Sequence, residues 1–344
     1  MLLIVRKRYS LMALVQIRNK KPSWRKELYM PMFSVIVPLY NKEQYIKKTV
    51  SCVLAQIITD FELIIVDDGS TDNGPRYVSE IQDERIRMVS QGNAGVSTAR
   101  NHGIREAKGK YICFLDADDT WNVDFLQTAK ELFDEFPDAG MVCPSYQVAY
   151  GNKVVHPVWK SVDMKKDSYV EDFYEMATAS FWICNSSCAA VKREVIQRME
   201  RWFPEGETVY EDFDFWIRLG SLCKVAHSNK ICATYQRETA TNARKTHEHK
   251  TVYSVSYMRT LDSLFNSDSL TIEQKKWIKE IKDRRMVPFV FSLLLAGEKK
   301  KAKQVLKDWK PCNTYKKYKM GLNACCCIPN RGLEIVQSIR MKVF

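Results

Sequence analysis

The sequence has 344 residues, of which 45% are hydrophobic and 27% are charged, so it is long enough for one large core with a smaller attachment. It contains no run of about 18 to 20 uncharged apolar residues, so no membrane-spanning helix is predicted. The eleven cysteines are odd in number and lack the paired spacing of a zinc site, which favours free thiols and a cytoplasmic location.

The net charge of +12 is unevenly distributed. Residues 1–30 carry 8 basic and 1 acidic side chains, residues 31–240 carry 23 and 31, and residues 241–344 carry 22 and 9. A basic terminal region suits attraction to anionic lipid headgroups, which predicts a peripheral position at the inner face of the plasma membrane. The alternative is a solvated helical surface without a partner. No recognition motif for nucleic acid occurs, so we expect no nucleic-acid partner.

From Phe33 onward, short apolar runs alternate with segments of helical period. This alternation is typical of an α/β fold with a Rossmann-like, mostly parallel central sheet flanked by helices. We expect strands at residues 33–39, 61–66, 86–89 and 111–115. We expect helices at residues 43–56 and 96–107, and a short helix that begins at Pro75.

Beyond Trp121 the pattern is mixed. The expected elements are helices at 124–136, 193–201 and 210–219 and strands at 141–150 and 185–191. From about Thr246 the chain is mostly basic and helical, as at 272–285 and 298–309. We therefore divide it into a basic extension over residues 1–30, for which an upstream start-codon assignment is one explanation, an α/β domain over 31–240, and a basic helical C-terminal region over 241–344.

Three carboxylates follow the fourth expected strand, in Asp116, Asp118 and Asp119. Open α/β sheets bind ligands beyond the carboxyl ends of their strands. Three carboxylates within four residues repel one another unless a cation compensates them, and Mg²⁺ or Mn²⁺ bound with substrate phosphates would do so. The alternative is a set of solvated turn and capping acids before the helix at Asp124.

A second acidic pair, Asp67 and Asp68, follows the second expected strand and precedes Gly69. The glycine permits a tight turn, and a carboxylate there can accept hydrogen bonds from a nucleobase or a ribose hydroxyl. Alone, this is an ordinary strand-to-turn sequence. It gains weight because parallel strands bring both acidic segments to the same edge of the sheet.

Five segments occur in an order that resembles family 2 glycosyltransferases with the GT-A fold. They are 34–41 (SVIVPLYN), 61–72 (FELIIVDDGSTD), 93–101 (NAGVSTARN), 109–119 (GKYICFLDADD) and 210–216 (YEDFDFW). The resemblance covers roughly residues 33–240. It implies an inverting hexosyl transfer from a nucleotide-diphosphate sugar, commonly linked to UDP, with Mg²⁺ or Mn²⁺ as the cofactor.

The resemblance also implies a set of donor-binding residues: Pro38, Tyr40, Glu43, Asp67, Asp68, Asn93, Arg100, Asp116 and Arg237. The first three would border the nucleoside, Asp68 would contact the base, and Arg100 would face the diphosphate. Asp116 and Asp118 would make the metal and ribose contacts, with Asp119 as a further metal ligand. Which of these three dominates metal binding stays open.

An inverting displacement needs a base that removes the proton of the acceptor hydroxyl. Asp212 fits the family pattern for this base, and Glu211 is the second choice. The alternative is that both acids only begin a helix, where negative charge is favoured. Trp182 and Asn185 precede the proposed base and are candidates for the acceptor pocket, because a tryptophan face stacks on a sugar ring. Ordinary packing is the alternative for the tryptophan.

The expected function is therefore sugar transfer to a hydroxyl of a glycan or lipid-linked glycan acceptor, in polysaccharide or cell-surface glycan biosynthesis. The acidic motifs on an α/β sheet leave two alternative functions. A nucleotidyltransferase would need a glycine-rich basic loop after the first strand, and residues 39–43 lack the glycines. A nucleotide-sugar binding module without turnover would have no physical reason to keep Asp118 and Asp212.

Overall fold

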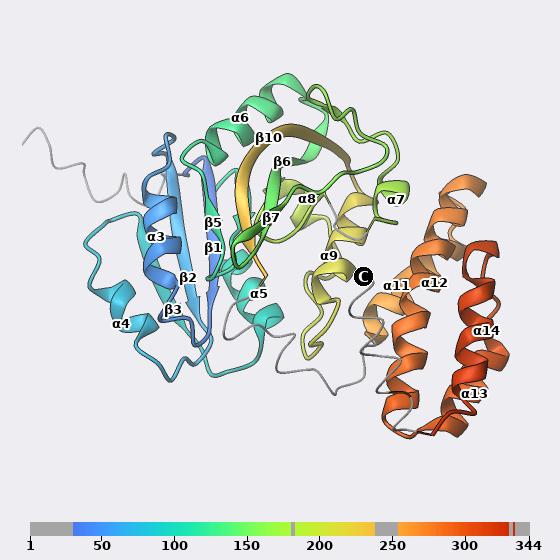
Figure 1. The fold of residues 1–344 in the computed structure, drawn as a ribbon. Helices are drawn as coiled ribbons and strands as arrows, with labels where there is room; N and C mark the ends of the chain where they lie inside the picture. Colours follow the sequence, from blue (N-terminus) through green and yellow to red (C-terminus); the bar gives the residue numbers. More distant parts are fainter. Residues whose placement is uncertain (1–29, 180–182, 238–253, 330–332, 334–344) are drawn as a thin grey trace, which may run out of the picture.

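The computed structural model describes residues 30–179, 183–237, 254–329 and 333. Within them, ten strands form one sheet in the order β3-β2-β1-β4-β9-β6-β10-β5, with β7 paired to β6 and β8 paired to β10. Helices flank this sheet, and a further group of helices stands beside it at the C-terminal side (Figure 1). The predicted α/β architecture with a helical C-terminal region is confirmed.

The first four strands are parallel to one another and match the predicted ranges to within one residue. They are β1 (Phe33–Leu39), β2 (Phe61–Asp67), β3 (Ile86–Ser90) and β4 (Tyr111–Phe114). All seven residues of β1 are buried, and this strand lies between β2 and β4. A strand covered on both faces has no polar side to present, so its sequence is almost continuously apolar. Residues 33–119 are called the β1–β4 unit below.

Three helices belong to the β1–β4 unit: α3 (Ile46–Leu54), α4 (Gly74–Ser79) and α5 (Val96–Glu106). Helix α5 packs directly on β1. A Cβ atom at Gly103 would lie 2.3 Å from Cγ2 of Ile36, so the close approach of this helix to the strand requires glycine. The packing fixes the position of Arg100, one turn earlier on the same helix.

The second half of the sheet is more irregular. Its strands are β5 (Thr120–Trp121), β6 (Ala139–Tyr150), β7 (Lys153–Val155), β8 (Ser168–Tyr169), β9 (Ala190–Lys192) and β10 (Lys224–Gln236). Its helices are α6 (Phe125–Glu135), α7 (Phe173–Met176), α8 (Arg193–Gln197) and α9 (Glu211–Gly220). Strand β9 is antiparallel to both β4 and β6, whereas β10 is parallel to β6.

Two sequence interpretations in this half were wrong or incomplete. The strand expected at 185–191 begins only at Ala190, because the preceding residues form turns. Strand β10 was not predicted, although it has 13 residues. Its interior includes His227 and Ser228, which are polar but buried and break the apolar pattern of a strand; the His227 ring contacts the carbonyl oxygen of Cys143 at 2.8 Å.

The C-terminal region consists of α11 (Val255–Asn266), α12 (Ile272–Leu295), α13 (Lys299–Asp308), the 3-10 helix η1 (Asn313–Tyr315) and α14 (Lys316–Cys325). Helix α12 begins with a capping box formed by Thr271 and Gln274. The sequence prediction ended this helix at Arg285, but the helix continues through Pro288. No helix in the described part of the chain is long and apolar enough to cross a membrane.

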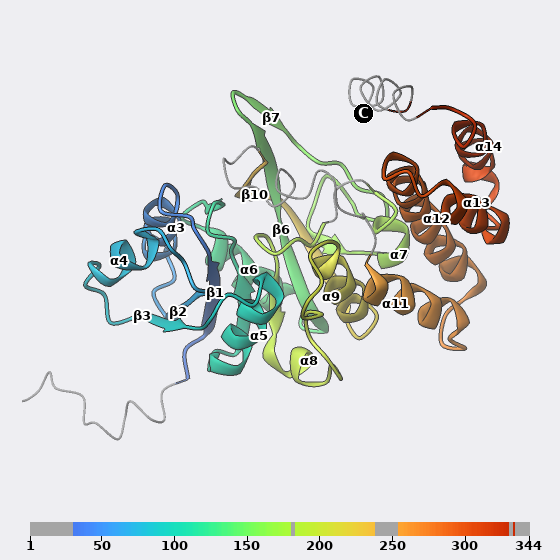
Figure 2. The ribbon, with the colours of Figure 1, turned by 90° about the horizontal axis from the view of Figure 1, so that it is seen from below.

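The C-terminal helices belong to two different cores. Tyr257 and Leu261 of α11 and Ile281 of α12 are buried in the main core with the sheet. From Val287 onward, α12 packs instead with α13 and α14 in a second core. Both views show α11 between α9 and α12 (Figures 1 and 2). The division at residue 241 remains a prediction, and the packing itself changes inside α12.

Candidate active site

Three loops of the β1–β4 unit meet at one edge of the sheet. β1 is parallel to both β2 and β4, and Leu39 lies beside Asp67 in register. Lys42, in the loop after β1, donates a hydrogen bond to the carboxylate of Asp118 in the loop after β4. The acidic segments at 67–68 and 116–119 therefore share one rim of the molecule, as expected for the carboxyl ends of neighbouring parallel strands.

Asp68 fixes the loop that leads into α5. Its Oδ1 accepts hydrogen bonds from Nε2 of Gln91 at 2.8 Å and from the backbone nitrogen of Ala94 at 2.9 Å. Its Oδ2 accepts one from the backbone nitrogen of Gly95 at 2.8 Å. These bonds give the buried carboxylate a loop-shaping role, and its contact with a nucleobase remains a prediction.

The turn after β2 depends on Asp67 and Gly69. Oδ1 of Asp67 accepts a hydrogen bond from the backbone nitrogen of Ser70 at 3.0 Å. Gly69 has a φ of 72°, and a Cβ atom there would lie 2.8 Å from the backbone nitrogen of Asn93. The two loops approach so closely that only glycine fits at residue 69, and this contact leaves Asn93 exposed at the rim.

The three residues predicted to border the nucleoside differ in their surroundings. Pro38 is buried within β1, and Tyr40 is exposed at the strand end. Oε2 of Glu43 accepts hydrogen bonds from the backbone nitrogen and Nδ2 of Asn73, at 3.0 and 3.1 Å, and so braces the loop before α4. Tyr40 therefore has an exposed aromatic ring on which a nucleobase could stack, and this contact stays a prediction.

The acids after β4 divide into two rim residues and one core residue. The side chains of Asp116 and Asp118 are 31% and 15% exposed, whereas Asp119 is fully buried. Asp119 accepts hydrogen bonds from Oγ of Ser187 at 2.5 Å and from the backbone nitrogen of Gln236 at 2.8 Å. Burial, and then the neighbouring carboxylates, raise the pKa of Asp119 well above its ordinary value. This geometry gives Asp119 a structural position and does not favour the metal role predicted for it.

Arg100 of α5 lies between the two acidic motifs of the site. Its Nη2 donates a hydrogen bond to Oδ1 of Asp116 at 2.7 Å, and its Nη1 lies 3.6 Å from Oε1 of Glu211 at the start of α9. The guanidinium is almost completely buried. Burial alone would lower the pKa of Arg100, but the carboxylates of Asp116 and Glu211 raise it, so the side chain remains charged. Arg100 thus joins the strand-end acids to the acids of α9.

Glu211 and Asp212 occupy the first turn of α9. Burial, followed by the charge of Asp212, raises the pKa of Glu211 to about 7, against the effect of Arg100. Burial also raises the pKa of Asp212, while Arg100 and a hydrogen bond from the backbone nitrogen of Phe213, at 2.8 Å, oppose the rise. Such carboxylates take up and release protons nearer neutral pH than ordinary acids do, which suits general base chemistry.

Of the residues predicted for the acceptor pocket and the last residue of the predicted donor set, the structure describes Asn185 and Arg237. Oδ1 of Asn185 accepts a hydrogen bond from the backbone nitrogen of Ser187 at 2.8 Å, so its carboxamide stabilises the turn before β9. The guanidinium of Arg237 donates to the Tyr150 hydroxyl and lies 5.1 Å from the centre of that ring, at the end of β6. Trp182 lies outside the described residues. The acceptor role of Asn185 and the donor role of Arg237 remain predictions.

Sequence reasoning missed two residues that organise the rim. Lys42 pairs with Asp118, and its position directly after the segment 34–41 was the available signal. Ser187 donates to Asp119 and accepts from the backbone nitrogen of Asp116 at 3.1 Å. Nothing in the sequence distinguishes this serine from a surface residue, because its partners lie about seventy residues away along the chain.

The carboxylates at the rim can be compared with the ligands that a divalent cation requires. Mg²⁺ and Mn²⁺ at phosphate sites are commonly bound by one or two carboxylates together with substrate phosphates. In the described part of the chain, no group of three or more His, Cys, Asp or Glu side chains could enclose a metal ion. Asp116 and Asp118 retain exposed carboxylate surface and fit the smaller requirement of a cation shared with a diphosphate.

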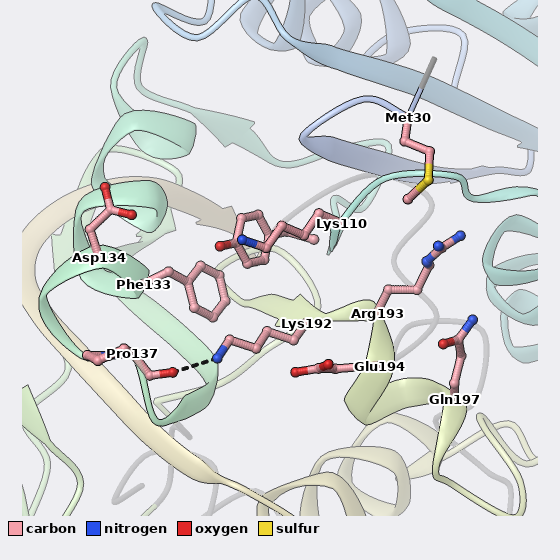
Figure 3. Close-up of a pocket in the computed structure, with 10 residues that line it drawn as sticks. Met30, Lys110, Phe133, Asp134, Pro137, Lys192, Arg193, Glu194 and Gln197 are labelled. Atoms are coloured by element: carbon pink, nitrogen blue, oxygen red, sulfur yellow. Dashed lines mark hydrogen bonds between the residues drawn. The ribbon is translucent and has the colours of Figure 1, made fainter. Parts of the chain in front are cut away.

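A hollow of about 420 Å³ lies at the opposite end of the strands. It is bordered by Met30 before β1, Lys110 before β4 and Lys192 at the end of β9 (Figure 3). Lys192 donates a hydrogen bond to the carbonyl oxygen of Pro137 at 2.6 Å. Strand β4 separates Lys110 at this hollow from Asp116 at the other end of the strand, and none of the proposed site residues lines the hollow.

Comparison with known proteins agrees with this geometry. Residues 34–199 match the family described as glycosyl transferase family 2. The chain is 30% identical to a chondroitin synthase of Escherichia coli over 214 residues, which are 59% of this chain and 28% of that protein. The aligned part of the chain spans between about a quarter and about half of the length of the first curated relatives.

Solved structures share the fold at low sequence identity. TarS of S. aureus, residues 1–349 in complex with UDP-GlcNAc, superposes with a TM-score of 0.66 at 18% identity, over 90% of this chain and 92% of that one. The mannosyltransferase PcManGT from Pyrobaculum calidifontis, in complex with GDP-Man and Mn²⁺, gives a TM-score of 0.53 at 18% identity, over 88% and 87% of the two chains. These similarities show that the described residues have a GT-A-like fold.

Proposed function

We propose that the chain, which belongs to glycosyltransferase family 2 through residues 34–199, is a sugar transferase. In this proposal it moves a sugar from a nucleotide-diphosphate donor to a hydroxyl of a glycan or lipid-linked acceptor. The transfer inverts the configuration at the anomeric carbon. The bridge made by Arg100 carries this proposal. One buried guanidinium contacts Asp116 of the donor motif and lies 3.6 Å from Glu211, next to the proposed base. This bridge supports the proposal that the donor-binding acids and the base act on the same pair of substrates.

In the proposed reaction, Asp212 accepts the proton of the acceptor hydroxyl. The acceptor oxygen then forms a bond to the anomeric carbon on the face opposite the leaving group. The bond from that carbon to the phosphate oxygen breaks, and its electron pair leaves with the nucleoside diphosphate. Only displacement from the opposite face inverts the anomeric configuration, so the base and the diphosphate must lie on opposite sides of the sugar.

Glu211 and Arg100 support Asp212 in this step. The raised pKa of Asp212 makes its carboxylate a stronger base than an exposed aspartate. The pKa of Glu211, about 7, means that this neighbour is partly protonated at neutral pH. A protonated neighbour adds no negative charge beside the base, so Asp212 can remain ionised next to it.

The rim residues would bind the donor. Asp116 and Asp118 would hold the divalent cation, which supplies positive charge to the diphosphate leaving group when bound. Lys42 contacts Asp118 and is a second positive group at the same place. Tyr40 presents its exposed ring beside the loops of Asp67 and Asp68, where a nucleobase would stack.

UDP is the favoured nucleotide of the donor. Two solved relatives support different choices, because TarS was crystallised with UDP-GlcNAc and the Pyrobaculum enzyme with GDP-Man and Mn²⁺. TarS has the higher TM-score, 0.66 against 0.53. For the process, the chondroitin synthase relative supports a role in polysaccharide or cell-surface glycan biosynthesis.

A second part of the proposal concerns the acceptor's location. Helices α13 and α14 have ten residues each, carry five and three lysines, and expose most of them. Each well-placed lysine near an anionic bilayer contributes about 1 kcal/mol of attraction. We infer that this surface brings the enzyme to the inner face of the membrane, where a lipid-linked acceptor would be available.

A donor panel tests the proposed function. The full chain is incubated with UDP- and GDP-linked sugars, with and without Mn²⁺, and the released nucleotide is identified. Release of UDP that requires Mn²⁺ is the expected result. Release of pyrophosphate would indicate a nucleotidyltransferase, and donor binding without any released nucleotide across the panel would indicate a binding module; either outcome contradicts the proposal.

A further inference from the structure

An arginine of the C-terminal helices reaches the proposed base. Arg285 lies on α12, and the central carbon of its guanidinium is 4.6 Å from the ring centres of both Tyr210 and Phe213 and 5.9 Å from that of Tyr257. No other cation in the described residues contacts three aromatic rings in this way. Its Nε is buried and has no hydrogen-bond partner among these residues, so the rings are its main contacts.

Two of these rings belong to the residues that flank the catalytic acids. Tyr210 directly precedes Glu211, and Phe213 directly follows Asp212. The third ring, Tyr257, is fully buried on α11. A cation packed against rings on both sides of the acid pair restricts the backbone that carries them, and each such contact is favourable when it is shielded from water.

The start of α9 needs an external support. Tyr210 is the N-cap residue of this helix, with a left-handed φ of 59° and no side-chain capping hydrogen bond. A left-handed backbone is unfavourable for a bulky residue and persists only when its surroundings impose it. The stack of Arg285 on the Tyr210 ring is a contact that can stabilise this conformation, and the backbone bond from Asp214 nitrogen to Tyr210 oxygen, at 3.0 Å, completes the first turn.

We propose that Arg285 is a positioning residue for the base: it clamps the Tyr210 and Phe213 rings and so fixes the Asp212 carboxylate toward the acceptor. The inference rests on the proposed function for the identity of the base. It also gives the C-terminal helices a part in the reaction, since α12 supplies a side chain that packs against the start of α9.

The charges around Asp212 agree with this role. Burial raises the pKa of Asp212, and the positive charges of Arg100 from α5 and Arg285 from α12 both oppose that rise. The negative groups that face it are Glu211 on the same helix and Asp116 after β4. The Tyr257 hydroxyl of α11 stays protonated, because burial raises its pKa. Arg285 thus brings a positive charge to the acid pair from the C-terminal helices.

Two substitutions test the clamp in the full chain. R285M keeps an unbranched side chain but removes the guanidinium and its charge, and we expect kcat to fall about tenfold while KM for the nucleotide-sugar donor changes by less than about twofold. R285K retains a cation over the rings and should recover at least about threefold of the lost rate. Hydrogen exchange of the amides of residues 211–214 should become faster in R285M and return toward the wild-type rate in R285K.

Arg284 provides the matched control, because it lies next to Arg285 on the same helix and donates a hydrogen bond to the carbonyl oxygen of Thr178. R284M should retain a kcat within about twofold of the wild type. Equal losses of kcat in R284M and R285M, or an R285M protein with unchanged kcat and unchanged exchange at 211–214, would overturn the inference. The exchange measurement does not depend on turnover, so it decides on the clamp even if the wild-type chain transferred no sugar and the proposed function failed.

Discussion

The β1–β4 unit and the surroundings of α9 fix their functional acids in different ways. In the β1–β4 unit, Asp67, Asp68 and Asp116 stand at the ends of buried strands, and most of their partners lie in loops of the same unit. Around α9, the first turn is fixed by residues from three other parts of the chain. Arg100 comes from α5, and Arg285 and Thr260 come from the C-terminal helices.

The difference shows that the two parts of the proposed reaction depend on packing to different degrees. Donor-side groups are placed by strand order, which local sequence determines strongly. The proposed base is placed by contacts that exist only after the C-terminal helices have packed on α9. Changes near α9 should therefore affect folding and transfer together, whereas changes at the strand ends should affect mainly donor binding.

The largest expected effect is at Asp214, the fully buried acid of α9. It accepts hydrogen bonds from Arg201, from Arg218 and from Oγ1 of Thr260, the last at 2.5 Å. D214A would leave the largely buried guanidinium of Arg218 without its counter-ion and the Thr260 hydroxyl without its acceptor, so we expect the free energy of unfolding to fall by about 3 to 5 kcal/mol in urea titrations.

An ion pair inside the β1–β4 unit serves as the comparison for the buried Asp214. Asp83 and Arg85 form an ion pair within one loop, at 2.8 Å and partly exposed. Because such a pair is solvated, D83A should lower the free energy of unfolding by less than about 1 kcal/mol. Equal losses in D83A and D214A would contradict the distinction between the two regions.

A smaller effect is expected from the titration of Glu211. Its folded pKa is about 7 and its ordinary value is 4.5. Between these two values the unfolded chain releases the proton while the folded chain keeps it, so stability falls as the pH rises through this window and is constant above it. E211Q lacks this titration and should gain about 3 °C in melting temperature over the wild type between about pH 5 and pH 8. If the melting temperatures of the two proteins changed equally with pH across that range, the pKa of Glu211 would not be raised.

The smallest effect on the active site is expected from substitutions in the basic helix α13. Lys303 and Lys307 are exposed on α13, which packs in the second core. The double substitution K303E/K307E should weaken binding to phosphatidylglycerol vesicles at least about tenfold, at about 1 kcal/mol for each lysine. The exposed Lys153 of β7 is the control, and K153E should bind like the wild type. Equal vesicle binding by the wild type and both variants would contradict the membrane proposal and would leave the proposed active site unchallenged.

The β1–β4 unit could be predicted almost completely from the sequence. Its strands are buried on both faces and read as apolar runs, and its acids follow these runs directly. The second half of the sheet could not be predicted as well, since β10 carries buried polar residues such as His227 and α12 continues through Pro288. In both places tertiary packing outweighs the local pattern.

The candidate site shows the same limit. Strand ends indicated which acids gather at the rim, but not that Asp119 turns into the core toward Ser187 or that Asp68 fixes the loop before α5. These outcomes depend on backbone nitrogens and on side chains distant in sequence. The role of Arg285 has the same origin, because the three rings it contacts come from two helices that meet only in the folded chain.

The most direct test of the account is a paired titration calorimetry and transfer measurement on D118N and D212N with a UDP-sugar and Mn²⁺. If the strand-end acids bind the donor and α9 supplies the base, D118N should weaken Mn²⁺-dependent donor binding at least about tenfold. D212N should bind the donor like the wild type and lose transfer by at least about a hundredfold. Preserved transfer in D212N, or unchanged Mn²⁺-dependent donor binding in D118N, would contradict the claim that these acids form one site.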